Sequence, residues 1–276
     1  MKVAVFSAKR YDRELLAAAN AEAGHELVFF DDLLETSTVA LTAGCGAVCV
    51  FVNDRVDAAV LAALAGGGTG LVALRCTGFN NVDLKAAAAQ SIKVVRVTEY
   101  SPYSVAEHAV ALILALSRKI HRAYNRTRDG NFELDGLLGA DLRGRTVGVI
   151  GTGKIGRVFA RIMTGFGCQL IGYDKIPNSD FEGMGGRYVQ LPELAACSDI
   201  VSLHCPLTHE THYLVDASAL RSDADQPSRG SLVDTEAVIA ALKSRQLGAL
   251  RIDGYESRAT LATACCRDAT NPLLIS

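Results

Sequence analysis

Short apolar runs alternate with longer helix-like stretches through the first hundred residues of the chain. Near-continuous apolar strands separated by helices are typical of a parallel sheet whose two faces are both covered. We therefore expect one parallel α/β lobe over residues 1–100. Its predicted strands are Lys2–Phe6, Glu26–Phe30, Ala47–Val52, Leu71–Cys76 and Val94–Val97, and its predicted helices are Asp12–Ala23, Val56–Ala65 and Val82–Gln90.

A second alternation of the same kind begins at Thr146. The helical pattern before it, from about Ser104 to Arg126, predicts a single long helix that links two lobes and belongs to the second, residues 101–276. The polar stretch Arg221–Gly230 has no apolar run, so we expect this second doubly wound sheet to lack one strand. Its predicted strands are Thr146–Ile150, Gln169–Tyr173, Asp199–Cys205 and Ala249–Ile252, and its predicted helices are Lys154–Gly165, Leu191–Ala196 and Thr235–Gln246.

Composition narrows the classes of protein to consider. A net charge of −2 over 276 residues disfavours a general attraction to nucleic acid or to an anionic membrane. The longest apolar helical run, Ala109–Leu116, is too short to span a bilayer, and the first residues enter a strand pattern directly, which predicts no signal peptide. The eight cysteines are scattered, mostly within apolar runs, so we expect buried free thiols and a reducing compartment such as the cytoplasm.

The strongest chemical signal is the segment from Gly151 to Gly156, which reads GTGKIG. It follows an apolar strand and opens a helix, and Asp174 ends the next strand. In a dinucleotide-binding turn, Gly151 permits the tight bend, Gly153 lets the backbone approach the pyrophosphate, and Gly156 allows close packing of helix on strand. The helix N-terminus supplies N–H groups to the phosphates.

The acidic residue after the second strand indicates which dinucleotide is bound. Asp174 would accept hydrogen bonds from the adenosine ribose and repel a 2′-phosphate, so NAD is expected rather than NADP. The alternative is a glycine-rich turn that binds nothing, and the strand, helix and acid together disfavour it. The first lobe has no such loop, because Ser7–Arg10 follows its first strand.

Several segments over about residues 1–255 resemble the D-isomer-specific 2-hydroxyacid dehydrogenases, and most closely their lactate-specific members. The resemblance implies a flavodoxin-like substrate lobe, a Rossmann NAD lobe, and oxidoreduction between a 2-oxo acid and a D-2-hydroxy acid, foremost pyruvate and D-lactate. By the same analogy a homodimer forms through the helical region after Tyr103. The segments that carry the resemblance are Arg75–Asp83, Tyr100–His108, Gly148–Gly156, His204–Thr208 and Ser228–Thr235.

The resemblance also implies roles for individual residues. The backbone around Gly78, Phe79 and Asn80 would hold the substrate carboxylate, and Tyr100 would close on it. Arg229 matches the catalytic arginine that binds the carboxylate and the carbonyl, for which a guanidinium fork is suited; a surface arginine is the alternative. For the cofactor, the implied contacts beyond the three glycines are Lys154, Ile155, Asp174, Cys205, Pro206, Thr211 and Asp253.

The proton donor of the family has no counterpart in this chain. Family members use a histidine held by a glutamate, yet the histidines here stand at positions 25, 108, 121, 204, 209 and 212, and Asp253–Glu256 is followed by Ser257 and Arg258. Segments 221–230 and 256–276 thus look altered or truncated. The alternatives to a dehydrogenase are a non-catalytic NAD-binding or NAD-sensing protein and a non-productive truncated product. No metal site is expected, since only Cys205 accompanies the histidines at 204, 209 and 212.

Overall fold

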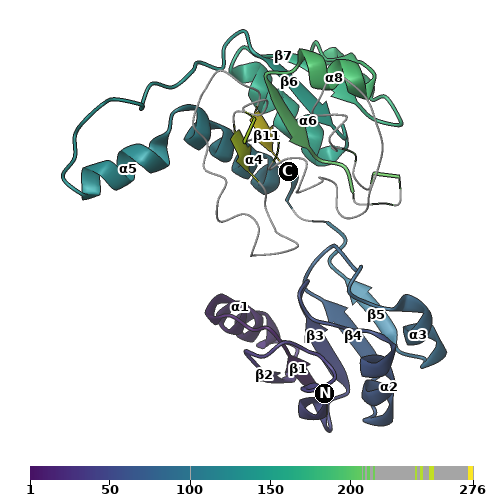
Figure 1. Ribbon diagram of the computed structural model, residues 1–276. Helices are drawn as coiled ribbons and strands as arrows, with labels where there is room; N and C mark the ends of the chain where they lie inside the picture. The colour runs from purple at the N-terminus through teal and green to yellow at the C-terminus, as the bar shows by residue number, and fades with distance from the viewer. Residues whose placement is uncertain are drawn as a thin grey trace. The chain divides into compact units, whose positions relative to one another are not determined.

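The computed structural model describes residues 1–99, 101–206, 208, 210, 211, 214, 240, 243 and 244, together with the backbone of 249–251 and 273–275. The chain divides into two compact units, Met1–Tyr100 and Ser101–Ser276. Each unit is built on its own parallel sheet with helices packed against it (Figure 1). The predicted helix Thr235–Gln246 and the polar stretch 221–230 lie largely or wholly outside the described residues.

The first unit holds a five-stranded parallel sheet in the order β2-β1-β3-β4-β5. This is the flavodoxin-like order, and it confirms the parallel α/β fold expected from the apolar runs. The strands are β1 Lys2–Val5, β2 Glu26–Phe29, β3 Ala47–Val50, β4 Leu71–Leu74 and β5 Lys93–Arg96; the helices are α1 Arg10–Asn20, the 3₁₀ turn η1 Val39–Thr42, α2 Ala58–Gly66 and α3 Leu84–Ala89.

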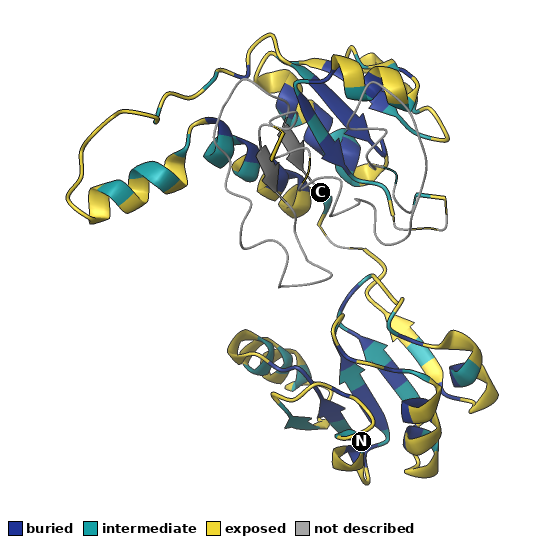
Figure 2. Ribbon diagram, viewed as in Figure 1, coloured by how far each residue is buried: buried dark blue, intermediate teal, exposed yellow. Residues whose placement is uncertain are grey.

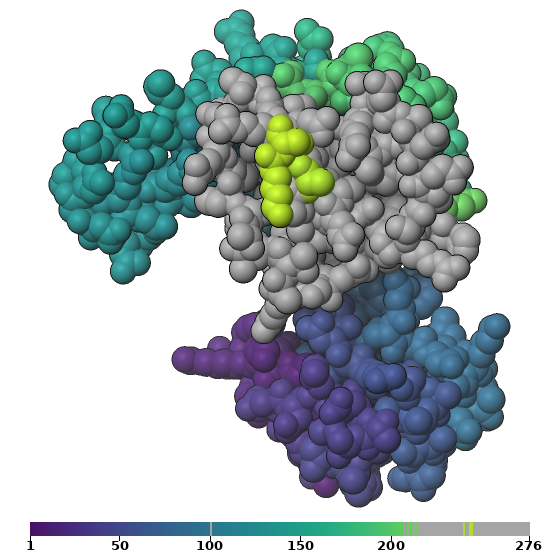
Figure 3. Space-filling model, viewed as in Figure 1, coloured from purple at the N-terminus to yellow at the C-terminus, as the bar shows by residue number. Residues whose placement is uncertain are grey.

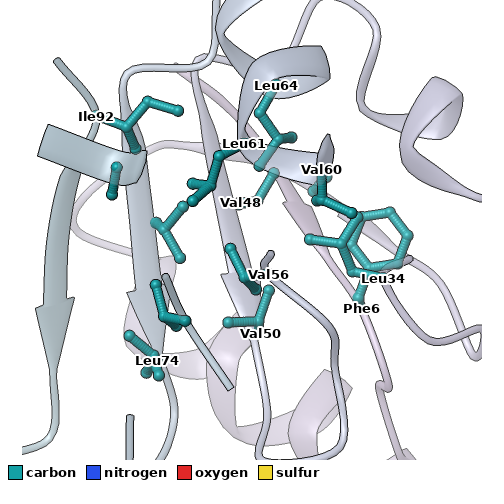
Figure 4. Close-up of a cluster of buried hydrophobic side chains, with 14 of the residues drawn as sticks. Phe6, Leu34, Val48, Val50, Val56, Val60, Leu61, Leu64, Leu74 and Ile92 are labelled. Carbon is teal, nitrogen blue, oxygen red and sulfur yellow. The ribbon is translucent and has the colours of Figure 1, made fainter. Parts of the chain in front are cut away.

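The core of this unit lies where α2 covers the sheet. Asp57 begins α2 by accepting hydrogen bonds from the backbone of Ala59 and Val60, both at 3.1 Å. The helix then buries Val60, Leu61 and Leu64 completely against strand residues such as Val48 (Figure 4). Each such side chain contributes about 1.5–3 kcal/mol relative to exposure, so this face fixes the helix on the sheet.

The second unit holds a six-stranded sheet in the order β10-β11-β9-β6-β7-β8. The central strand β6 pairs with β7 on one side and with β9 on the other, both parallel. The direction in which the sheet grows therefore reverses at β6, which is the topological switch point where doubly wound sheets bind their ligands. The strands are β6 Thr146–Ile150, β7 Gln169–Tyr173, β8 Arg187–Tyr188, β9 Ile200–Leu203, β10 Ala249–Arg251 and β11 Leu273–Ile275.

One strand of this sheet comes from the tail of the sequence. β11 lies between β9 and β10 and pairs in parallel with both. The sequence pattern gave no indication of a strand there. The expectation of a missing strand concerned Arg221–Gly230, which lie outside the described residues.

The predicted single helix from Ser104 to Arg126 is wrong, because the structure divides it into α4 Pro102–Ser117 and α5 Ile120–Arg128. Lys119, at φ +53°, takes a left-handed conformation between them. The cause is a distant segment: Ala140 donates its N–H to the carbonyl oxygen of Ser117 at 3.3 Å, so this oxygen is withdrawn from the helical ladder.

The two helices differ in burial (Figure 2). α4 packs against α6 Lys154–Gly165, whereas α5 has no buried residue. The described part of the unit also holds two shorter helices, α7 Ser179–Gly183 and α8 Leu191–Cys197. Within the described residues, every helix is too short or too polar to cross a bilayer.

Candidate functional site

The glycine loop joins β6 to α6 at the switch point of the second sheet. Gly151 has φ +92°, and a Cβ there would stand 2.6 Å from the backbone nitrogen of Cys205. A Cβ on Gly156 would collide with the carbonyl oxygen of Gly151. At Gly153, in contrast, no atom of the described residues beyond its chain neighbours lies within 4 Å of the place a Cβ would take. Two of the glycines are thus required by packing, and the third leaves an open face over the loop.

The open face lies at the start of a twelve-residue helix. Gly153 is the N-cap of α6 and has no side chain with which to accept a bond from the first N–H groups. These donors and the positive end of the helix dipole suit a phosphate. The loop therefore fits a dinucleotide pyrophosphate, with Lys154 and Ile155 in the first turn of the helix.

Asp174 lies directly against this loop, just after β7. Its Oδ2 accepts hydrogen bonds from the backbone N–H of Thr152 at 2.6 Å and from the Thr152 hydroxyl at 3.1 Å. Its Oδ1 accepts a bond from the backbone N–H of Ile176 at 3.2 Å. The predicted ribose-binding acid and the predicted phosphate loop are thus adjacent in space, 22 residues apart in sequence.

The segment that follows β9 forms the other side of the loop. The backbone of His204 donates to Ile150 at 2.7 Å, and the His204 ring packs on Phe159 with centroids 4.9 Å apart. Nε2 of this ring lies 3.0 Å from the hydroxyl of Ser202. Withdrawal from water lowers the pKa of His204 to about 4, so the ring is neutral at pH 7 and is a poor proton donor there.

Cys205, Pro206 and Thr211 follow in the same segment. Burial raises the pKa of the Cys205 thiol, which keeps it protonated at neutral pH. The Thr211 hydroxyl donates to the carbonyl oxygen of Pro206 at 2.6 Å and closes a short turn. An exposed ion pair between Lys175 and Glu210 joins this turn to the segment after β7.

The predicted substrate-binding segment of the first unit is an exposed loop between β4 and α3. Gly78, Phe79 and Asn80 are all exposed, and the Arg96 guanidinium covers the Phe79 ring at 5.1 Å. Cys76 fastens the base of the loop by donating its thiol to the carbonyl oxygen of Gly78 at 3.2 Å. The three residues of the loop are thus open to solvent in the first unit.

Arg75, at the base of this loop, faces inward. Its guanidinium donates to the carbonyl oxygen of Phe6 at 3.0 Å and lies 3.4 Å from the Asp12 carboxylate. These contacts tie the base of the loop to the residue after β1 and to α1. Three other predicted site residues, Tyr100, Arg229 and Asp253, lie outside the described residues.

Two residues of the NAD-binding half were missed by sequence reasoning. Thr152 was assigned no role, although its hydroxyl contacts Asp174. Nothing in the sequence pattern indicated a role for Tyr188, because its hydroxyl is brought to Thr152 only by the pairing of β8 with β7. In the described part of the chain, no three His, Cys, Asp or Glu side chains converge as a metal site would require.

Comparison with known proteins supplies the family. Residues 110–274 match the family model described as D-isomer specific 2-hydroxyacid dehydrogenase, NAD binding domain. The chain belongs to this family. The resemblance seen in the sequence is confirmed, as is NAD as the cofactor and dehydrogenase as the class of enzyme.

Similar proteins of this family include two bacterial relatives. A 2-hydroxyacid dehydrogenase homolog of Haemophilus influenzae is 51% identical over 266 residues, covering 95% of this chain and 80% of the relative. The D-lactate dehydrogenase of Escherichia coli is 48% identical, covering 95% and 81%. The apo-structure of D-lactate dehydrogenase from Escherichia coli superimposes with a TM-score of 0.90 at 45% identity, covering 100% of this chain and 89% of that one.

Proposed function

We propose that this 2-hydroxyacid dehydrogenase interconverts pyruvate and D-lactate. The contact of Asp174 with the glycine loop carries the NAD half of the proposal. The 48% identity to the D-lactate dehydrogenase of Escherichia coli supports the choice of substrate. NAD accepts or supplies the hydride when it is bound, and the residues of this chain bind and orient the two reactants.

The assignment of the cofactor contacts follows the fit of the loop. Gly151, Gly153 and Gly156 shape the turn, and the backbone of Lys154 and Ile155 donates to the pyrophosphate. Asp174 accepts from the adenosine ribose, with Cys205, Pro206 and Thr211 beside the nucleotide and Asp253 toward the nicotinamide. The start of α6 at Gly153 and the space above that residue support this arrangement.

The assignment of the substrate contacts rests on residue chemistry. Arg229 pairs bidentately with the carboxylate and polarises the 2-oxo group, since a guanidinium presents two parallel N–H donors. The backbone at Gly78, Phe79 and Asn80 donates to the same carboxylate, and Tyr100 shields it from water. The exposure of this loop in the first unit supports its availability for a small acid.

A second candidate function is NAD binding without turnover. The observation that favours it is the state of His204, which lies beside the glycine loop. Its ring is neutral at pH 7 and packs against Phe159, so it is a poor donor of the proton that the reaction needs. Loss of a general acid typically lowers the rate by about 10²–10⁴.

One pair of assays separates the two functions. NADH binding is titrated by the fluorescence of the cofactor, and NADH oxidation is then followed with pyruvate. Turnover that disappears in Arg229→Ala while NADH binding persists supports the dehydrogenase. Binding with no oxidation of NADH supports the second candidate, and the absence of binding contradicts both.

We also propose that the chain forms a homodimer through α5 and the segment that follows it, residues 129–139. Three large apolar side chains there are strongly exposed: Phe132 at 77%, Leu134 at 78% and Leu138 at 86%. Arg126 holds the segment in place by donating to the carbonyl oxygens of Glu133 and Asp135. The two parts stand out from the rest of the second unit (Figure 3), and exposed apolar surface of this kind marks contact with another protein.

The compartment is proposed from the thiols. Each of the described cysteines is free, and Cys45 and Cys76 are buried as expected, whereas Cys197 is exposed. Because an oxidising compartment favours disulfides, free thiols are in keeping with a reducing cytoplasm.

A further inference from the structure

The hydroxyl of Tyr188 lies between two groups of the NAD-binding half. The backbone N–H of Asn178 donates to it at 2.8 Å, and the hydroxyl of Thr152 lies 2.7 Å from it. Thr152 is buried and belongs to the glycine loop itself. Tyr188 thus connects the end of β8 to the residue that contacts Asp174.

The protons in this connection have only one consistent arrangement. The Thr152 hydroxyl donates to Oδ2 of Asp174, and a hydroxyl has a single proton to give. Tyr188 must therefore donate its own proton to Thr152 while it accepts the N–H of Asn178. The result is a directed chain of three hydrogen bonds that ends on the Asp174 carboxylate.

These bonds also limit what the carboxylate can still accept. Both acceptor positions of Oδ2 are taken, one by the Thr152 N–H and one by the Thr152 hydroxyl. Oδ1 already accepts the N–H of Ile176. A carboxylate offers about four acceptor positions in all, so the described residues leave one open, on Oδ1. That single position suits one ribose hydroxyl.

The ring of Tyr188 is held in place by packing against Phe181. The fully buried ring of Phe181 lies 5.2 Å from the Tyr188 ring, centroid to centroid. Two glycines make room for it: a Cβ on Gly172 would stand 2.6 Å from the Phe181 ring, and one on Gly186 would collide with it. Since Tyr188 pairs with Gly172 across β7 and β8, the position of Phe181 sets that of the tyrosine.

We propose that Tyr188 is a positioning residue that, through Thr152, holds Asp174 in the orientation that selects NAD over NADP. The proposal rests on the assignment of Asp174 to the adenosine ribose made above. A held carboxylate presents its free acceptor position to a ribose hydroxyl. It also cannot turn away from a 2′-phosphate, so the repulsion of NADP persists.

The test measures binding of NADH and of NADPH to the full chain by cofactor fluorescence; the chain has no tryptophan to interfere. Tyr188→Phe keeps the ring on Phe181 and removes only the hydroxyl, and Thr152→Val removes its partner. Each variant should raise the dissociation constant of NADH about 3- to 10-fold, the value of one neutral hydrogen bond, and leave that of NADPH equal or lower. The double variant should do no more than either single one.

The ratio of the two dissociation constants separates positioning from a merely structural role. A structural defect weakens the binding of NADH and NADPH alike and leaves the ratio of their dissociation constants unchanged, and this outcome overturns the proposal. If Tyr188→Phe does not fold, an unchanged ratio in Thr152→Val overturns it in the same way. Tyr11→Phe, an exposed tyrosine of the first unit, is the matched control and should change neither constant. If Asp174→Asn also leaves NADH binding unchanged, the ribose assignment itself fails; if only Asp174→Asn weakens it, the role of Tyr188 alone fails.

Discussion

Gly156, in the first turns of α6, lies directly against the carbonyl oxygen of Gly151, at the end of β6. Because a Cβ on Gly156 would collide with that oxygen, Gly156→Ala should push the helix from the strand. Overpacking of this kind costs about 1–3 kcal/mol, which denaturant unfolding of the variant should reveal as a lower free energy of unfolding. An unchanged unfolding curve would show that α6 can move away from β6 to make room for the methyl group without a loss of stability.

Gly153→Ala should have the opposite profile. A methyl group there meets no protein atom within 4 Å, so the free energy of unfolding should stay within about 0.5 kcal/mol of the parent. The same methyl occupies the open face of the loop, so the dissociation constant of NADH should rise about tenfold or more, equivalent to about 1.4 kcal/mol. Measured together, the two glycine variants separate packing from cofactor approach. Full NADH affinity in Gly153→Ala would place the pyrophosphate elsewhere.

The buried ring of His204 predicts a dependence of stability on pH. Its folded-state pKa of about 4 lies below the ordinary 6.5, so between these values the unfolded chain binds the extra proton. Stability from this group is therefore fully present above pH 6.5 and is lost as the pH falls toward 4. The parent should therefore lose about 3 kcal/mol of unfolding free energy from this group as the pH falls from 6.5 to 4, and His204→Gln should not show this loss. A curve identical to that of the parent would mean that His204 titrates normally.

The apolar side chains on residues 129–139 predict the oligomeric state. The parent chain should sediment as a dimer. The double variant Phe132→Ser, Leu138→Ser should raise the dimer dissociation constant about 30-fold or more, as expected when at least one hot-spot side chain worth about 2 kcal/mol is lost. Leu15→Ser, which alters another exposed leucine, on α1, should leave the dimer intact. A parent chain that sediments as a monomer, or a double variant that remains a dimer, would exclude this interface.

The strand β11 predicts that the backbone near the end of the sequence supports the NAD-binding unit. Leu274 pairs with Leu250 on one side and with Val201 on the other. Leu274→Pro removes one N–H from this ladder and should cost about 1–3 kcal/mol, measured as a lower urea midpoint. Leu274→Ala keeps the N–H and serves as the control, so equal losses in the two variants would show that the ladder contributes little.

Local patterns were sufficient to predict most of the strands and the glycine loop between β6 and α6. The predicted strands Thr146–Ile150 and Gln169–Tyr173 agree with β6 and β7 residue for residue, since buried parallel strands appear as apolar runs between turns. Other boundaries differ by a few residues. The predicted roles of Gly151 and Gly156 agree with their surroundings, because glycine requirements follow from backbone geometry that a short motif encodes.

Distant contacts decided what the sequence alone did not reveal. The break at Lys119 depends on Ala140, which takes the carbonyl oxygen of Ser117 more than twenty residues away. The place of Tyr188 depends on the Phe181 ring, for which Gly172 on a neighbouring strand leaves space. The sequence by itself determined the parallel α/β fold, the glycine loop and the acid that follows it. These features depend on the local spacing of apolar residues and on backbone conformations that require glycine. Only the tertiary structure placed Thr152 and Tyr188 on that acid, because hydrogen bonds between strands depend on pairing and packing that no local pattern records.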